Sequence, residues 1–297
     1  MLLLPKDIGI RVAAVALLDH AHAAAKALVK ADDPDELHDF RVALRRLRSW
    51  MRAFKLELSD GVSKKQRRQL KDIAAATNAG RDFEVLRDWM RDAAKGRSAR
   101  RKRGAKWMIQ HMKDAADDSI DVSVAEGFRD VRDDLEARLS ICSVNVRQLA
   151  DMSSLAGAIA ERIPTHSAAL KRALSKIATV DDEDEAHQAR ITAKRLRYLI
   201  EPGAPLVKSG AVLLQSLRSL QSELGTLHDA HIIGREIHRA LEDGPAGASR
   251  ESLETINTHV GDAAKAAFAS VRRHWLRGRY ARLDQSVARF ARRLAKL

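Results

Sequence analysis

The chain has 297 residues, of which 53 are Lys or Arg and 40 are Asp or Glu, so its formal net charge is +13 and its pI is near 10.1. This charge predicts a polyanionic partner, although it does not by itself separate nucleic acid, phospholipid and polyphosphate. The single cysteine excludes an internal disulfide and a zinc site built on several cysteines, and aromatic residues, at 4% of the chain, are too few to favour single-stranded nucleic acid held by base stacking.

The N-terminal residues are apolar, but Pro5, Lys6, Asp7 and Arg11 interrupt them and no small-residue cleavage site follows. We therefore expect no signal peptide. No run approaches the roughly 18 to 20 apolar residues of a membrane-spanning helix, so we expect no membrane partner. The lone cysteine, Cys142, suits a reducing compartment, and we expect a cytoplasmic protein.

Helix-forming residues dominate the sequence, apolar residues recur with a helical period, and strand-like alternation is nearly absent. The sequence therefore predicts an all-α fold. A first helix is expected over 8–30. A second begins after Asp33 as N-cap, with Pro34 at the first helical position and Glu36 three residues after the cap. Asp182 and Glu185 repeat this arrangement before the second histidine of the repeat.

The second predicted helix carries a row of cations within the stretch HDFRVALRRLRSWMRAF. An ordinary solvated helix face mixes acids with bases so that they pair at i and i+4, whereas this row contains no acid. The repulsion along the row favours a bound anion over a merely solvated face. At about 100° per residue, the residues that fall within roughly 80° of one another are His38, Arg41, Arg45, Arg48 and Arg52.

More cations follow in the first half of the chain. A helix is expected over 63–78 with a break at Gly80, and a fourth over 83–94. Between 95 and 106 there are seven cations and no acid, which leaves open a phosphate-gripping arm or a solvated loop. Helices near 105–118 and 124–140 complete this half, and 143–151 is the expected join. A second tier of residues that could add to an anion site consists of Lys64, Lys65, Arg68, Lys71 and Arg81, together with His228 in the second half of the chain.

The row returns in the second half as HQARITAKRLRYLI. Both copies have the pattern H-x-x-R-x-x-x-[RK]-R-L-R, and the offset between the two histidines is 187 − 38 = 149. The repeat predicts one unit with two similar halves, 1–145 and 146–297. Glu201 stands where the first copy has Arg52. The cations that share one face of the second copy are His187, Arg190, Lys194 and Arg197.

The helices after the second row follow the order of the first half. A helix over 207–224 is expected to end at Gly225, and another covers 230–241. His228-Asp229 lies between them, in the place of Arg81-Asp82. Two further helices are expected near 249–275 and 279–296.

The chemistry of the two rows suits a linear chain of phosphates. Arginine meets phosphate with several N–H donors and lysine with a point charge, and cations one helical turn apart lie about 5 Å from each other. At the edge of each row, His38 and His187 are interpreted as phosphate donors, with a buried capping role as the alternative. The neighbouring arginines should lower the pKa of these histidines until an anion binds.

A metal-dependent phosphohydrolase is the weakest hypothesis that we weigh. His228 and His231 lie at i and i+3. His38-Asp39 and His228-Asp229 each resemble the HD pair of such enzymes, but no third pair has convincing spacing. The sequence also lacks a phosphate loop and a nucleophile elbow, so we expect no catalysis, no metal and no cofactor. Nucleic-acid binding, which rests on charge alone, stays the main alternative.

The paired motif, with Arg81-Asp82 or His228-Asp229 further along, resembles the CHAD family, the conserved histidine α-helical domain, over about residues 5–297. The resemblance implies two four-helix bundles with additional helices, related by an internal pseudo-twofold. It also implies a basic surface that binds inorganic polyphosphate, and members are described as associating with polyphosphate granules. The motif residues of the family fall on His38, Arg41, Arg45, Arg46 and Arg48, and on His187, Arg190, Lys194, Arg195 and Arg197.

Two departures from the family pattern put in doubt how evenly the halves share a ligand. His228 replaces the arginine that pairs with Asp229, and Glu201 ends the second row early. The E-x-E-x-K signature of the triphosphate tunnel domain, to which many relatives are fused, has no full match in this chain. The resemblance therefore implies a stand-alone, non-enzymatic binding module.

Overall fold

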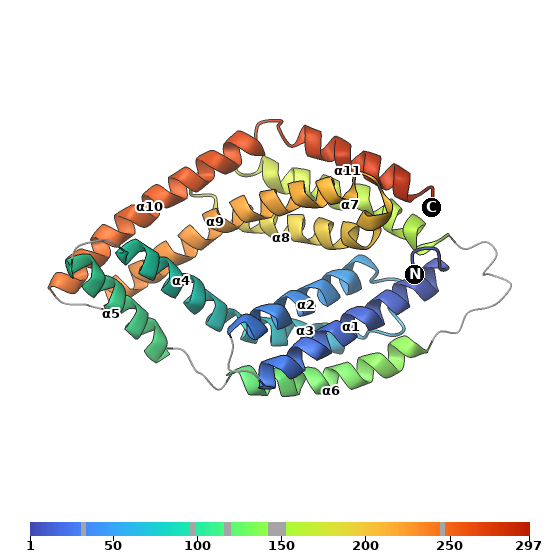
Figure 1. Cartoon of the computed structure of the whole chain (residues 1–297), viewed down its shortest axis with the longest axis horizontal. Helices are drawn as coiled ribbons and strands as arrows, with labels where there is room; N and C mark the ends of the chain where they lie inside the picture. The colour runs from blue at the N-terminus through green and yellow to red at the C-terminus, as the bar shows by residue number, and fades with distance from the viewer. Residues whose placement is uncertain (31–33, 96–98, 116–119, 142–152, 244–246) are drawn as a thin grey trace.

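The protein is built from α-helices, which confirms the predicted all-α class (Figure 1). The computed structural model describes residues 1–30, 34–95, 99–115, 120–141, 153–243 and 247–297, and these form eleven α-helices and one 3₁₀ helix. In the first half the helices are α1 (Lys6–Lys30), α2 (Pro34–Ala53), α3 (Lys64–Ala76), α4 (Asn78–Ala94), α5 (Ala99–Ala115) and α6 (Ile120–Ser140). In the second half they are α7 (Leu155–Ser175), α8 (Glu183–Ile200), the 3₁₀ helix η2 (Glu201–Leu206), α9 (Gly210–Glu242), α10 (Ala248–His274) and α11 (Ala281–Leu294).

The helix with the first cation row, α2, packs its apolar side against α1, and α6 also lies against α1. Phe40 of α2 meets Phe128 of α6 edge-on, with ring centroids 5.4 Å apart. Trp50 is buried, and its Nε1 donates to the backbone oxygen of Ile10 in α1 at 3.0 Å. Because these contacts bury one side of α2, the basic side is left to face the second half of the molecule.

The second cation row lies on α8, which packs between α7 and α9, while α11 covers α7. Ala189, Ala193 and Leu196 of α8 are fully buried in this layer. The helices α2 and α8 also contact each other, so the two halves meet along the helices that carry the repeat. The N-terminal residues strengthen this junction, because the backbone N–H of Lys6 donates to the oxygen of Ser153 at 2.9 Å.

A third group of helices is formed from both halves. Figure 1 shows α4 and α5 reaching the far end of α9 and α10, and α5 packs closely on α10. Gly104 permits this approach, since a Cβ at that position would lie 2.3 Å from Oγ of Ser252. The helices thus form one continuous core. Symmetry between the halves, and a division at 145, stay predictions.

The helix α9 runs without a break from Gly210 to Glu242. The predicted helix end at Gly225 is therefore wrong. The break predicted at Gly80 is present but falls three residues earlier, at Thr77, so that Gly80 lies in the first turn of α4. A single glycine in a helix interior costs only about 1 kcal/mol relative to alanine, which packing readily offsets. As a consequence, residues before and after Gly225 share one helix face.

Other helix boundaries differ less from the predictions. The helix predicted near 105–118 begins earlier, at Ala99, so part of the cation-rich stretch 95–106 is helical. Asp182 is the N-cap of α8 as predicted, but its side chain accepts from the N–H groups of Ala178 and Thr179 instead of from its own helix. The predicted N-cap Asp33 and the predicted join 143–151 lie outside the described residues.

The stretch Lys6–Val29 of α1 is long and apolar enough, by length and composition alone, to cross a membrane. The expectation that no segment reaches this limit is wrong for α1, because its few charges do not lower the mean hydropathy enough. In the fold, Ile10, Ala14 and Leu18 of this helix are fully buried among neighbouring helices. A core helix meets the same criteria of length and composition.

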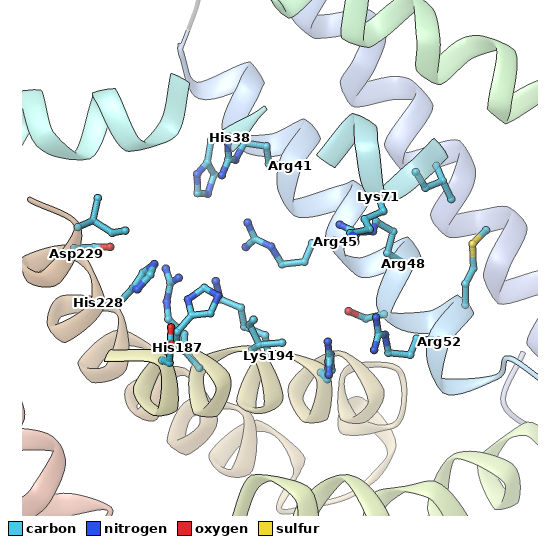
Figure 2. A pocket seen from close by; sticks show the side chains of 18 of the residues that line it. His38, Arg41, Arg45, Arg48, Arg52, Lys71, His187, Lys194, His228 and Asp229 are labelled. Carbon is cyan, nitrogen blue, oxygen red and sulfur yellow. The ribbon is translucent and has the colours of Figure 1, made fainter. Parts of the chain in front are cut away.

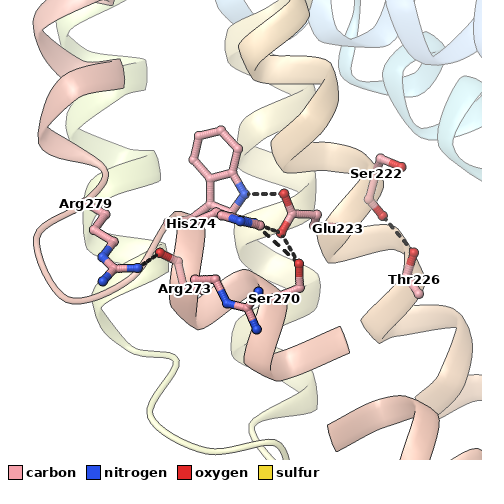
Figure 3. A network of polar contacts seen from close by, with 8 residues as sticks. Ser222, Glu223, Thr226, Ser270, Arg273, His274 and Arg279 are labelled. Carbon is pink, nitrogen blue, oxygen red and sulfur yellow. Dashed lines mark hydrogen bonds and ion pairs between the residues drawn. The ribbon is translucent and has the colours of Figure 1, made fainter. Parts of the chain in front are cut away.

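The packing of α10 on α9 is fixed by a polar network around Glu223 (Figure 3). Its carboxylate accepts from Oγ of Ser270 at 2.8 Å and from Nε1 of Trp275 at 3.0 Å, and it lies 2.9 Å from Nδ1 of His274. Burial acts to raise the pKa of Glu223, but the hydrogen bonds outweigh it and the pKa is lowered. In a Ser–His–acid relay the serine contacts the ring nitrogen opposite the acid, whereas both groups here contact Nδ1, so the network serves to hold the helices together.

Candidate anion-binding pocket

The two cation rows face a common pocket with a volume of about 950 Å³ (Figure 2). One side is formed by α2 and α3, and the other by α8 and α9. The two rows therefore converge on one pocket. The predicted site residues that line it are His38, Arg41, Arg45, Arg48, Arg52, Lys71, His187, Arg190, Lys194, Arg195 and His228.

The α2 side of the pocket is a row of cations one helical turn apart, which we call the α2 row: His38, Arg41, Arg45, Arg48 and Arg52. His38 and Arg52 are exposed at its two ends, and the three residues between them are partly buried. Burial lowers the pKa of Arg48, and the neighbouring charges of Arg52 and Arg45 lower it further. Among the described residues, α2 and α3 contribute no acid to the pocket lining.

The α8 side contains Lys194, the residue that the repeat pairs with Arg45. Burial, and next the charges of Arg45, Arg190 and Arg197, lower the pKa of Lys194 from 10.5 to about 6, against a smaller opposing effect of Asp229. The ammonium form is therefore unfavourable while the pocket holds no anion. Burial likewise lowers the pKa of Arg195, with contributions from Arg52 and Arg48 across the pocket.

Two histidines meet at the α8–α9 side of the pocket. The ring centroids of His187 and His228 are 4.6 Å apart with an interplanar angle of 40°. Burial and the charges of Arg190 and then Lys194 lower the pKa of His187, as the sequence predicted for the row histidines, although burial is the larger cause. Burial and the surrounding cations lower the pKa of His228 to about 3, so both rings are neutral near pH 7.

Acidic residues also line this side. Glu183, Asp184 and Asp229 all border the pocket, and the sequence reasoning did not place them there. Glu183 accepts a hydrogen bond from Nη1 of Arg235 at 3.0 Å. Asp184 partly opposes the lowering of the pKa of His187, and Asp229 partly opposes that of Lys194, so each carboxylate acts on a neighbouring base. The α8–α9 side is therefore of mixed sign, unlike the α2 row.

Two of the predicted motif residues, Arg46 and Arg197, do not line the pocket. Nη1 of Arg197 donates to Glu201 at 2.6 Å, and Nε of Arg46 lies 3.3 Å from the other carboxylate oxygen of Glu201. Both guanidinium groups also lie against the ring of Tyr198, at 4.5 Å and 5.9 Å from its centroid. Glu201, which the sequence showed only as a missing cation, thus joins α2 to α8.

Among the second tier of predicted residues, too, some line the pocket and others do not. Lys71 and His228 line the pocket, whereas Lys64, Lys65 and Arg68 are exposed on α3 outside it, and Arg68 lies 3.8 Å from Asp72. A residue on α3 faces the pocket only if it shares the side that carries Lys71. The side chain of Arg81 lies outside the described residues. No described residue of the cation-rich stretch 95–106 lines the pocket.

His228 and His231, the possible metal-binding pair, have different contact partners. Nε2 of His231 lies 2.8 Å from the backbone oxygen of Val180, while His228 faces His187. Within the part of the chain that the structure describes, no group of three or more His, Cys, Asp or Glu residues could hold a metal ion.

Three cations of the pocket were missed by the sequence reasoning: Lys55, Arg67 and Arg235. Arg67 donates to the backbone oxygen of Met51 at 2.5 Å, so it reaches the pocket by closing the end of α2. No local signal could have revealed this contact. Arg235 was within reach of the sequence, because it lies two turns after His228 and shares its face once α9 is taken as continuous.

The comparisons with known proteins agree with this architecture. A family model of the CHAD domain matches residues 13–238. Two solved structures are similar to the chain: the CHAD domain from the plant Ricinus communis, with a TM-score of 0.66, 20% identity and coverage of 95% of this chain and 92% of that chain, and PptA from Streptomyces chartreusis, with a TM-score of 0.62, 16% identity and coverage of 92% and 100%. At these identities the likeness shows the fold alone. No curated protein matches the chain in sequence.

Proposed function

The chain belongs to the CHAD domain family, and from this premise we propose that it binds inorganic polyphosphate in the pocket between α2 and α8 without altering it chemically. The family resemblance supplies the ligand. The observation that carries the proposal is the convergence of cations from α2, α3, α8 and α9 on one pocket of about 950 Å³. Cations outnumber the three carboxylates of the lining, and a bound anion would offset the repulsion that remains among them.

The perturbed groups of the pocket support an anionic ligand. Burial, and next the repulsion of neighbouring cations, lower the pKa of Arg48, Lys194 and Arg195. A polyanion in the pocket offsets the repulsion, so that these groups bind their protons more tightly. Binding therefore relieves an electrostatic cost that the ligand-free protein carries.

The shape of the pocket favours a linear ligand without bases. From His38 to Arg52 the α2 row spans 14 residues, or about 21 Å of helix axis, with one cation at each turn. Among the described residues that line the pocket there is no Phe, Tyr or Trp on which a base could stack. These two features favour polyphosphate over single-stranded nucleic acid.

The direct test is a charge reversal on both sides of the pocket. We expect Arg45→Glu with Lys194→Glu to abolish measurable binding of a polyphosphate of defined length in calorimetric titration. Arg218→Glu with Arg292→Glu is the matched control, because it changes the net charge equally at two exposed positions outside the pocket. Equal losses in the two double variants would overturn the proposal.

A competition experiment distinguishes polyphosphate from nucleic acid as the ligand. Backbone-driven binding of DNA also depends on cations and falls steeply with salt, so charge reversal alone does not distinguish the two ligands. At equal phosphate concentration and fixed salt, duplex DNA should fail to displace polyphosphate from the protein. Displacement by DNA would reverse the ranking of the two ligands.

The proposal of a binding protein, as opposed to an enzyme, has its own assay. A phosphohydrolase would release orthophosphate in the presence of a divalent ion and lose this activity in His228→Ala. We expect no release with Mg²⁺, Mn²⁺ or Zn²⁺. We further propose a cytoplasmic location at polyphosphate granules, and a fluorescent fusion that stays diffuse in cells rich in granules would contradict it.

A further inference from the structure

The α8–α9 side of the pocket contains five groups that differ in kind from the α2 row. We call them the α8–α9 corner: Asp184, His187, Lys194, His228 and Asp229. The α2 row presents only cations, whereas the corner combines a lysine and two imidazoles with two carboxylates. Figure 2 shows His187, Lys194 and His228 projecting into the same part of the pocket, with Asp229 beside them.

The two imidazoles of the corner are positioned to exchange hydrogen bonds with a ligand. Nδ1 of His187 and Nδ1 of His228 are both buried, and neither has a hydrogen-bond partner in the part of the chain that the structure describes. A ligand oxygen meets one of these covered nitrogens only when the ring turns its Nδ1 edge toward the pocket, and the hydrogen bond formed then removes the free-energy cost of the unpaired nitrogen. The ring centroids lie 4.6 Å apart, so the rings touch each other, and one phosphate group at their pocket-facing edges could contact both.

The carboxylates restrict which phosphate fits. A carboxylate repels a fully ionised phosphate but accepts a hydrogen bond from a P–OH group. Asp184 acts electrostatically on His187, and Asp229 acts on Lys194, so a phosphate that reaches the bases also meets an acid. A site that contained only cations, such as the α2 row, would place no such condition on its ligand.

The phosphates of a linear polyphosphate are of two kinds. An internal phosphate carries one strongly acidic group and no proton near neutral pH. A terminal phosphate ionises a second time with a pKa of about 6, like a phosphate monoester, so it has a larger charge and still offers a proton for part of the time. Only the terminal group matches a set of bases with carboxylates beside them.

We propose that the α8–α9 corner binds the terminal phosphate of a polyphosphate chain while the α2 row binds its internal phosphates. The inference rests on the proposed function, because it assigns roles within the same pocket. Lys194 supports it, since its pKa in the ligand-free protein is lowered to about 6, so the amine can take up the proton that a terminal phosphate brings and an internal phosphate lacks. The pocket would then recognise a chain end and fix the direction in which the chain runs along α2.

The test compares two polyphosphates of one defined length, the first with free ends and the second with both terminal phosphates capped as phosphoramidates. The wild-type protein should bind the free-ended chain about tenfold more tightly, which is the size of one charge-assisted hydrogen bond. Equal affinity for the two chains would overturn the inference and leave the proposed function standing. Failure of both chains to bind would overturn the proposed function as well.

Variants test which residues of the pocket cause the preference for chains with free ends. In His228→Ala and in Asp229→Asn the ratio of the two affinities should fall to near one, while His38→Ala at the other row should weaken both chains equally and keep the ratio. Asp229→Asn preserves the size of the side chain, so it tests the charge even if His228→Ala disturbs packing. Retention of the tenfold ratio in both corner variants would overturn the assignment to the corner.

Discussion

The helices α2 and α8 carry the same motif but present it differently to the pocket. On α2, Arg48 lines the pocket and Arg46 does not, whereas on α8 Arg195 lines it and Arg197 does not. Each helix turns a different one of two neighbouring motif cations away, and both of the cations turned away meet Glu201. The comparison teaches that a repeated motif specifies which cations are present, while contacts between the halves decide which of them line the pocket.

The paired positions Arg45 and Lys194 sharpen the contrast. Arginine keeps its charge at any ordinary pH, whereas lysine in a crowded cationic site can lose its proton. The pKa of Lys194 is lowered to about 6, chiefly by burial and then by the charge of Arg45. In this pair it is therefore the lysine whose charge depends on a bound anion or on a lower pH.

The largest expected effect on polyphosphate affinity comes from reversing the charge of a motif cation that lines the pocket, and a motif cation outside the pocket serves as the comparison. Arg45→Glu should weaken polyphosphate binding about 100-fold or more, because it places an anion within the α2 row. Arg197→Glu, a motif cation outside the pocket, should change the affinity only slightly but lower stability, since it sets a second carboxylate beside Glu201. Titration and thermal unfolding of both variants measure this difference. Equal losses of affinity would show that Arg197 also contacts the ligand.

The next effect is a pH dependence that belongs to α8. We expect a polyanion to bind the protonated form of Lys194 more tightly than the neutral form, and the pKa of this lysine in the ligand-free protein is about 6. Affinity should therefore be highest at or below pH 6 and should fall as the pH rises, by up to tenfold per unit until the pKa of the bound state is reached. The charged groups that act on this lysine are Arg45, Arg190, Arg197 and Asp229.

This pH dependence is measured with end-capped chains, whose charge does not change over the range. Lys194→Met should remove the slope, and Lys71→Met is the control, because Lys71 is an exposed lysine of the same pocket. A slope that persists in Lys194→Met would assign it to another group, with His187 as the first candidate.

A smaller effect concerns stability without ligand. Between pH 6 and 10.5, a lysine with a lowered pKa binds fewer protons in the folded state than in the unfolded state. Such a lysine destabilises the fold, and the destabilisation grows as the pH falls from 10.5 to 6. Lys194→Met should therefore raise the melting temperature at pH 7, by about 2 °C or more. The gain should narrow at pH 9, and Lys71→Met should show none. A melting temperature that falls in Lys194→Met would contradict the assigned cost.

The smallest effect tests the link between the two helices. Glu201→Gln removes the carboxylate that holds Arg46 and Arg197, so we expect a loss of about 1 to 2 kcal/mol in the free energy of unfolding. Two released cations near the pocket should raise polyphosphate affinity about twofold to threefold. Glu236→Gln, which breaks a local pair with Arg239, is the control and should leave both quantities nearly unchanged. An unchanged stability in Glu201→Gln would remove the proposed link.

Much of the fold could be predicted from the sequence because helical periodicity is a local property. The helical spacing of cations and apolar residues in the two copies of the motif predicted α2 and α8 correctly, and Asp182 marked the start of α8. Glycine misled the prediction at Gly225, since its local cost is small and tertiary packing outweighs it. That error hid Arg235, which shares a face with His228 only on an unbroken α9.

The sequence by itself determined that the protein is helical, that a cationic motif occurs twice, and that each copy has a basic side opposite an apolar one, because all three follow from residue types at fixed helical spacing. Only the tertiary structure decided that the two basic sides face one pocket, that Glu201 withdraws Arg46 and Arg197 from it, and that carboxylates stand beside the histidines on one side. These features depend on how each helix is rotated against its neighbours. That rotation is set by packing between residues far apart in the chain, which local periodicity does not encode.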